Sequence, residues 1–102
     1  MSKWIFQDIL DIQDKHLHDI VLAQNNEEFE RLREEYYAAL REKVNAETYV
    51  RYELWRCDIY VDVDYIEVET KAIYGDSVTS ADILSWILEH KEEHHVLQYS
   101  QD

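Results

Sequence analysis

Two stretches in the N-terminal half of the chain repeat their apolar residues at helical spacing. In the first stretch, from Lys3 to about Ala23, one helical face carries Phe6, Leu10, Leu17 and Val21. In the second, which follows "QNNEE", apolar residues recur at steps of three and four: Phe29, Leu32, Tyr36, Leu40 and Val44. The connection is short, so the pattern predicts an antiparallel helix pair, with Asn26 as the N-cap of the second helix.

From about Thr48 the apolar period changes to two. Three runs alternate in this way: Val50, Tyr52 and Leu54; Ile59, Val61 and Val63; and Ile66, Val68 and Ala72. The inward parity differs between runs, which predicts breaks near Arg56–Asp58 and Asp64–Tyr65, the second of them as a turn or a β-bulge. The pattern therefore predicts two or three antiparallel strands. A rival interpretation extends the second helix through Leu54, but the density of Tyr, Val and Thr favours strands.

The segment "SVTSADILSWILEHKEEHH" predicts a C-terminal helix with a defined start. Thr79 is the expected N-cap and Asp82 stands at the third helical position, a variant of the capping box, while Val78 and Ile83 occupy the hydrophobic-staple positions. A loose tail is expected over about residues 98–102. The predicted fold class is α+β: an N-terminal antiparallel helix pair, a central two- or three-stranded antiparallel sheet and a C-terminal helix.

Length and composition indicate one domain over residues 1–102, with an apolar content of 46%. Cys57 is the only cysteine, so no internal disulfide is expected and a reducing, cytoplasmic setting is indicated. No apolar run approaches the roughly 18 residues of a membrane span, and acids follow the first Lys at once, so no signal peptide is expected. With one Gly and no Pro, Gly-rich phosphate-binding loops are excluded.

The net charge of −13 is large for so short a chain, and it is unevenly distributed. Residues 1–56 contain 12 acidic and 8 basic residues, whereas residues 57–102 contain 11 acidic and only 2 basic residues. A field of this sign opposes nucleic acids and anionic membranes, and it attracts basic protein surfaces. Neither a nucleic acid nor a membrane is therefore expected as a direct partner.

The stretch "DIYVDVDYIEVE", residues 58–69, concentrates acids within the expected strands. If Ile59, Val61 and Val63 face the core, the acids face water at strand spacing, about 6.6–6.8 Å apart. Such a line of carboxylates resembles the spacing of nucleic-acid phosphates, although a merely solvated outer face is the alternative. The expected partner-binding residues are Asp58, Tyr60, Asp62, Asp64, Tyr65, Glu67, Glu69 and Asp76.

A possible metal motif lies near the C-terminus, where "HKEEH", His90 to His94, matches the inverted zinc-protease pattern. A catalytic zinc needs a third protein ligand, and the sequence places none nearby. His16 and His18 fall on different helix faces and do not form a chelating pair. No catalytic residue, no metal and no cofactor are therefore expected, and we expect no tightly bound zinc.

In charge, length and scarcity of Gly and Pro the chain resembles the small acidic DNA-mimic inhibitors of phages, such as anti-restriction and anti-CRISPR proteins. It also resembles the acidic immunity proteins that block bacterial nucleases. This resemblance implies a non-enzymatic inhibitor that blocks a basic nucleic-acid-binding protein, either a host defence complex or a nuclease. The alternative is a structural or adaptor protein, acidic only for solubility, that acts through helix-mediated contacts; a homodimer stays open.

Overall fold

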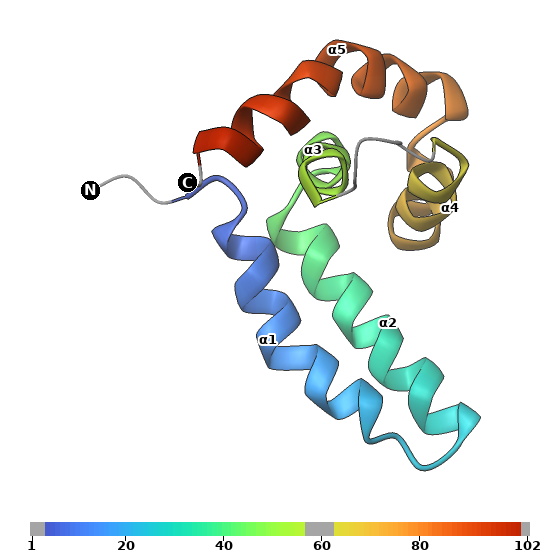
Figure 1. Ribbon diagram of the computed structural model, residues 1–102. Coiled ribbons are helices and arrows are strands. Elements are labelled where there is room, and N and C mark those ends of the chain that lie inside the picture. The colour runs from blue at the N-terminus through green and yellow to red at the C-terminus, as the bar shows by residue number, and fades with distance from the viewer. Residues whose placement is uncertain (1–3, 57–62, 101–102) are drawn as a thin grey trace. The chain divides into compact units, whose positions relative to one another are not determined.

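The computed structural model describes residues 4–56 and 63–100, and side chains in these ranges as far as Lys91 (Figure 1). These residues form helices and no strand: α1 (Gln7–Val21), α2 (Asn26–Lys43), α3 (Ala46–Arg56), α4 (Val63–Tyr74), the 3-10 helix η1 (Gly75–Ser77) and α5 (Ser80–Ser100). The chain divides into two compact units, residues 1–45 and residues 46–102.

The first unit is the antiparallel helix pair that the sequence predicts, with α1 and α2 side by side and joined by a short turn (Figure 1). Apolar residues at helical spacing are buried on both helices: Ile9, Ile12, Tyr36 and Leu40. The N-cap of α2 is Asn25 rather than Asn26, because Asn25 has an extended backbone and its side-chain oxygen accepts a hydrogen bond from the Glu28 N–H at 2.8 Å.

The prediction of an α+β fold with a central sheet is wrong for the described residues, because α3 and α4 occupy the positions expected to be strands. In α3, Val50 and Leu54 are four residues apart and both fully buried, so this run fits a helix as well as a strand. In α4, Ile66, Thr70 and Ile73 follow the same helical spacing and are buried. Packing of these faces overrides the strand preference of Tyr, Val and Thr.

The structure bears differently on the two breaks predicted between the strands. The turn or bulge expected at Asp64–Tyr65 is wrong, because both residues lie in the first turn of α4. The segment with Ile59 and Val61 lies outside the described residues. The rival interpretation, which extends the second helix through Leu54, is right that Leu54 is helical. It is wrong that one helix runs through this region, because α2 ends at Lys43, Val44 has an extended backbone, and α3 begins at Ala46.

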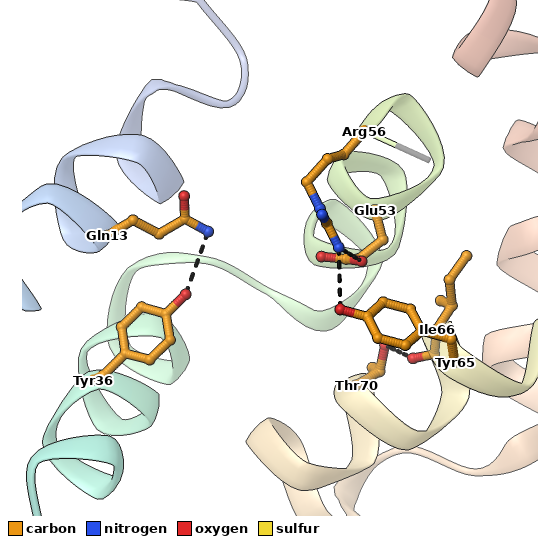
Figure 2. A network of polar contacts seen from close by, with 7 residues as sticks. All are labelled: Gln13, Tyr36, Glu53, Arg56, Tyr65, Ile66 and Thr70. Carbon is orange, nitrogen blue, oxygen red and sulfur yellow. Dashed lines mark hydrogen bonds and ion pairs between the residues drawn. The ribbon is translucent and has the colours of Figure 1, made fainter. Parts of the chain in front are cut away.

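The second unit has one apolar core, to which α3, α4, α5 and the turn before α5 contribute. The core consists of Ala46, Val50, Leu54, Ile66, Val78, Ile83 and Ile87. The buried hydroxyl of Thr70 does not disturb it, because Thr70 Oγ1 donates a hydrogen bond of 2.7 Å to the Ile66 carbonyl within α4 (Figure 2). The turn between α4 and α5 uses Gly75 at φ 64°, a left-handed conformation that glycine adopts without strain.

The predicted start of α5 is confirmed. The Asp82 N–H donates to Thr79 Oγ1 at 3.0 Å, and the Thr79 N–H donates to Asp82 Oδ2 at 3.2 Å. Val78 and Ile83, the staple residues, are both buried in the core. The reciprocal bonds satisfy two backbone donors that would otherwise lack partners at the helix end.

Replacing Thr79 with Ala should lower the free energy of unfolding by about 1 kcal/mol, because the N-cap oxygen is lost. Urea unfolding followed by circular dichroism measures the effect. Ser85→Ala, at an exposed position inside α5, is the matched control and should have no destabilising effect. Equal losses in the two variants would contradict a capping role for Thr79.

Candidate functional site

The acids of α4 are arranged differently from the predicted line of carboxylates. Asp64 and Glu67 share one side of the helix with Lys71, whereas Glu69 lies beside Tyr65 on another side. Between them the helix exposes Val68, whose side chain is 66% accessible. The predicted strand spacing is therefore wrong for four of the expected binding residues, because all of them lie in one helix: Asp64, Tyr65, Glu67 and Glu69.

The other predicted binding residues divide between described and undescribed parts of the chain. Asp58, Tyr60 and Asp62 lie outside the described residues. Asp76 is exposed in η1, in the turn that connects α4 to α5. The structure thus brings Asp64, Glu67 and Glu69 onto one helix and places Asp76 just beyond its end.

Within the described residues, several acids of the second unit lack a basic partner. Asp64, Asp76 and Glu89 are exposed, and none of them forms an ion pair with another described residue. Glu67 is engaged by a hydrogen bond from the Ser80 hydroxyl. Residues 63–91 contain only two basic residues, both Lys, so much of the negative charge in this region is left uncompensated.

The first unit compensates its acids more completely. Arg31 Nη1 lies 3.1 Å from Glu35 Oε2, and Arg41 Nη2 lies 3.7 Å from Glu34 Oε2. Both pairs are exposed and contribute little to stability. Their effect is on the surface field, because each pair cancels one negative charge of α2 at close range.

A polar network joins α3 to α4 in the second unit (Figure 2). Arg56 Nη2 donates hydrogen bonds to the buried Glu53 carboxylate at 2.9 Å and to the Tyr65 hydroxyl at 3.1 Å. The bond to Glu53 raises the pKa of Arg56, and partial burial together with the negative charges of Glu53 and Glu69 raises the pKa of Tyr65. Tyr65 is therefore partly committed to this internal network, although 41% of its surface remains accessible.

A second cluster in this unit could offer ligands to a metal. His90 Nε2 lies 2.7 Å from Glu47 Oε2, and ligand atoms of Glu47, Glu89 and His90 all lie within 4.8 Å of one another. Imidazole and carboxylate groups suit divalent cations such as Zn²⁺ and Mn²⁺. Glu47 and His90 already form a hydrogen bond with each other and Glu89 is exposed, so this contact accounts for the geometry, and the absence of tightly bound zinc stays a prediction.

The sequence motif His90 to His94 did not reveal this cluster. The partner of His90 is Glu47, which lies 43 residues earlier on a different helix. No local spacing could have indicated that contact. The side chain of His94, the second His of the motif, lies outside the described side chains.

A hollow of about 400 Å³ lies in the first unit between residues of α1 and α2. Its lining places three acids beside two Lys residues: Asp8, Asp11, Glu42, Lys15 and Lys43, with His16, Ile12 and Ala39. Because opposite charges lie close together there, the hollow has no strong preference for an anion or a cation.

Comparison with protein-family models, curated proteins and solved structures found no match for this chain. In the part of the chain that the structure describes, no helix combines the length and the apolar character needed to cross a membrane. The charges and exposed surfaces of the chain itself are therefore the features that point to a function.

Proposed function

We propose that this protein is a non-enzymatic acidic inhibitor that binds a basic nucleic-acid-binding protein and competes with nucleic acid for its surface. The observation that carries the proposal is the uncompensated negative charge of the second unit, where Asp64, Asp76 and Glu89 are exposed without an ion-pair partner among the described residues. The net charge of −13 also favours binding to a basic protein surface. The class of partner is a host defence complex or a nuclease in the cytoplasm.

A helical scaffold can serve this function without the strand spacing first expected. Binding of nucleic acid to Lys and Arg surfaces depends largely on charge and little on sequence. An acidic protein surface can therefore occupy such a groove when its carboxylates are exposed and unpaired. Complementary charge would also steer the encounter of the two proteins.

Charge reversal tests the proposal directly. The triple variant Asp64→Lys, Asp76→Lys, Glu89→Lys should remain folded, because all three side chains are exposed. It should slow association with the basic partner by about one to two orders of magnitude, because the steering field is lost. The measurement is capture of partners from nuclease-treated lysate, followed by binding kinetics with the captured protein.

The control is the triple variant Asp14→Lys, Glu30→Lys, Glu42→Lys, which makes the same change in net charge on exposed positions of the first unit. It should slow association much less. Added DNA or RNA should displace the captured partner from the wild-type protein, and raising salt should weaken the complex. A partner that is retained by the first triple variant, or that nucleic acid does not displace, would refute inhibition by charge mimicry.

A second candidate function is an adaptor that acts through helix surfaces. The observation that favours it is the exposure of large apolar side chains on α4 and α5: Val68 (66%), Leu84 (47%) and Leu88 (59%). An adaptor would keep its partner in the charge-reversal triple variant and lose it when Val68 and Leu88 are replaced with Gln. The charge-reversal triple variant of the second unit and the Val68→Gln, Leu88→Gln double variant therefore separate the two functions.

A further inference from the structure

The turn that joins α1 to α2 lies at the foot of Figure 1. The residues around it form an open, partly apolar hollow of about 370 Å³. Its lining combines apolar side chains with the amides of the turn: Ile20, Val21, Ala23, Gln24, Asn25, Asn26 and Phe29. Val21 is 81% exposed, and Leu22, the next residue, is 57% exposed. This end of the hairpin therefore holds apolar side chains that the packing of α1 against α2 does not cover.

Contiguous exposed apolar surface is less common than a single exposed side chain, and it marks interaction sites. Phe29, the apolar residue that α2 contributes to the hollow, contacts the guanidinium of Arg33. The guanidinium carbon of Arg33 lies 5.5 Å from the centre of the Phe29 ring and 5.9 Å from that of Tyr37. The Phe29 ring is thus packed against Arg33, while 38% of the residue stays exposed.

The surface next to this hollow is acidic. Asn25 also lines a neighbouring hollow, together with Glu27, Glu28 and Arg31. The Arg31 guanidinium faces Glu35 at 3.1 Å, so it does not neutralise Glu27 and Glu28 completely. Asp19, in the last turns of α1, is also exposed. A partly apolar hollow thus adjoins carboxylates on the same end of the hairpin.

We propose that this surface, the hairpin tip formed by Val21, Leu22, Phe29, Glu27 and Glu28, is a docking site for a basic amphipathic helix of a partner protein. An apolar side chain of that helix enters the hollow, and Lys or Arg residues beside it meet Glu27 and Glu28. Charge complementarity selects this occupant over a second copy of the chain, whose own tip carries the same acids. The proposal goes beyond competition with nucleic acid, because it adds an apolar anchor on the first unit.

The probe is a synthetic helical peptide with Leu along one face and Lys along the other, labelled for fluorescence anisotropy. Its affinity should fall about tenfold or more in the double variant Val21→Gln, Leu22→Gln, because the apolar contact is lost. The control is Ile5→Gln, which replaces an apolar side chain of the first unit that is 47% exposed and lies before the start of α1. This control should change the affinity by no more than about twofold.

A second peptide, with the same Lys residues and Ser in place of Leu, separates the apolar contact from general attraction to an acidic protein. It should bind about tenfold more weakly than the first peptide. Glu27→Gln, Glu28→Gln should also weaken binding of the Leu peptide while leaving α2 intact, since Asn25 still caps the helix.

Three outcomes would overturn the proposal: equal affinity for both peptides, equal losses in Val21→Gln, Leu22→Gln and in Ile5→Gln, or no binding of the Leu peptide at all. A dimer of the wild-type protein that Val21→Gln, Leu22→Gln abolishes would assign the hairpin tip to a second copy instead. Because the hairpin tip belongs to the first unit and the reversed charges belong to the second, a negative result with the peptides leaves the charge-reversal test of the proposed function unaffected.

Discussion

Arg56→Met should lower the free energy of unfolding by about 2–3 kcal/mol, whereas Glu53→Met should change it by no more than about 1 kcal/mol. The two residues form one ion pair at 2.9 Å, but only 3% of the Glu53 side chain is accessible, compared with 44% for Arg56. Removing Arg56 leaves a buried carboxylate without its cation. Removing Glu53 leaves a guanidinium that water can still reach, so the cost is smaller.

Urea unfolding of the two variants measures this asymmetry. The control is Arg31→Met, which breaks an ion pair whose two side chains are 64% and 53% accessible. That variant should lose less than about 1 kcal/mol, as exposed pairs do. If Arg56→Met were no more destabilising than Arg31→Met, the buried Glu53 carboxylate would not need the positive charge of Arg56 to be stable in the folded protein.

Leu54→Ala should be at least as damaging, with a loss of about 2–5 kcal/mol in the free energy of unfolding. The Leu54 side chain is fully buried in the core that α3, α4 and α5 share. Truncation removes apolar contacts and leaves a cavity that the surrounding side chains refill only in part. The same urea experiment measures the loss.

Leu84→Ala is the matched control for this core substitution, because Leu84 also lies on a helix of the second unit but is 47% exposed. Its cost should stay below about 1 kcal/mol. Similar losses in both variants would show that Leu54 is not in the core, and would count against the packing of α3 as the structure has it.

The sequence was sufficient where the structural signal is local. The helix pair and α5 follow from apolar residues at steps of three and four and from capping side chains, and Thr79 and Asp82 make the contacts expected of them. The start of α2 was off by one residue, because adjacent asparagines offer the same side chain. Only the extended backbone of Asn25 decides between Asn25 and Asn26.

The sequence was misleading where a short run fits two periods. Val50, Tyr52 and Leu54 alternate like a strand, yet Val50 and Leu54 are also one helical turn apart. Tyr49 and Tyr52 are both buried as well, which a one-sided strand does not predict. Contacts with α5, which begins more than twenty residues later in the chain, favour the helix, and no local pattern contains that information.

The same limit applies to the candidate sites. Net charge does not depend on secondary structure, so the acidity of the second half could be read directly from the sequence. The positions of the carboxylates could not, because a helix distributes residues around its axis that a strand would align. The contacts of Arg56 with Tyr65 and of His90 with Glu47 join different helices, and only the tertiary fold brings them together.

The helical state of α3 and α4 also affects how quickly the chain can fold. A sheet would have required pairing between distant strands, whereas helices form their backbone hydrogen bonds within a few residues, and such chains fold on a timescale of about microseconds to milliseconds. The chain also contains no Pro, so no prolyl bond has to isomerise before the native state is reached. Refolding from urea should therefore have no phase that lasts tens of seconds.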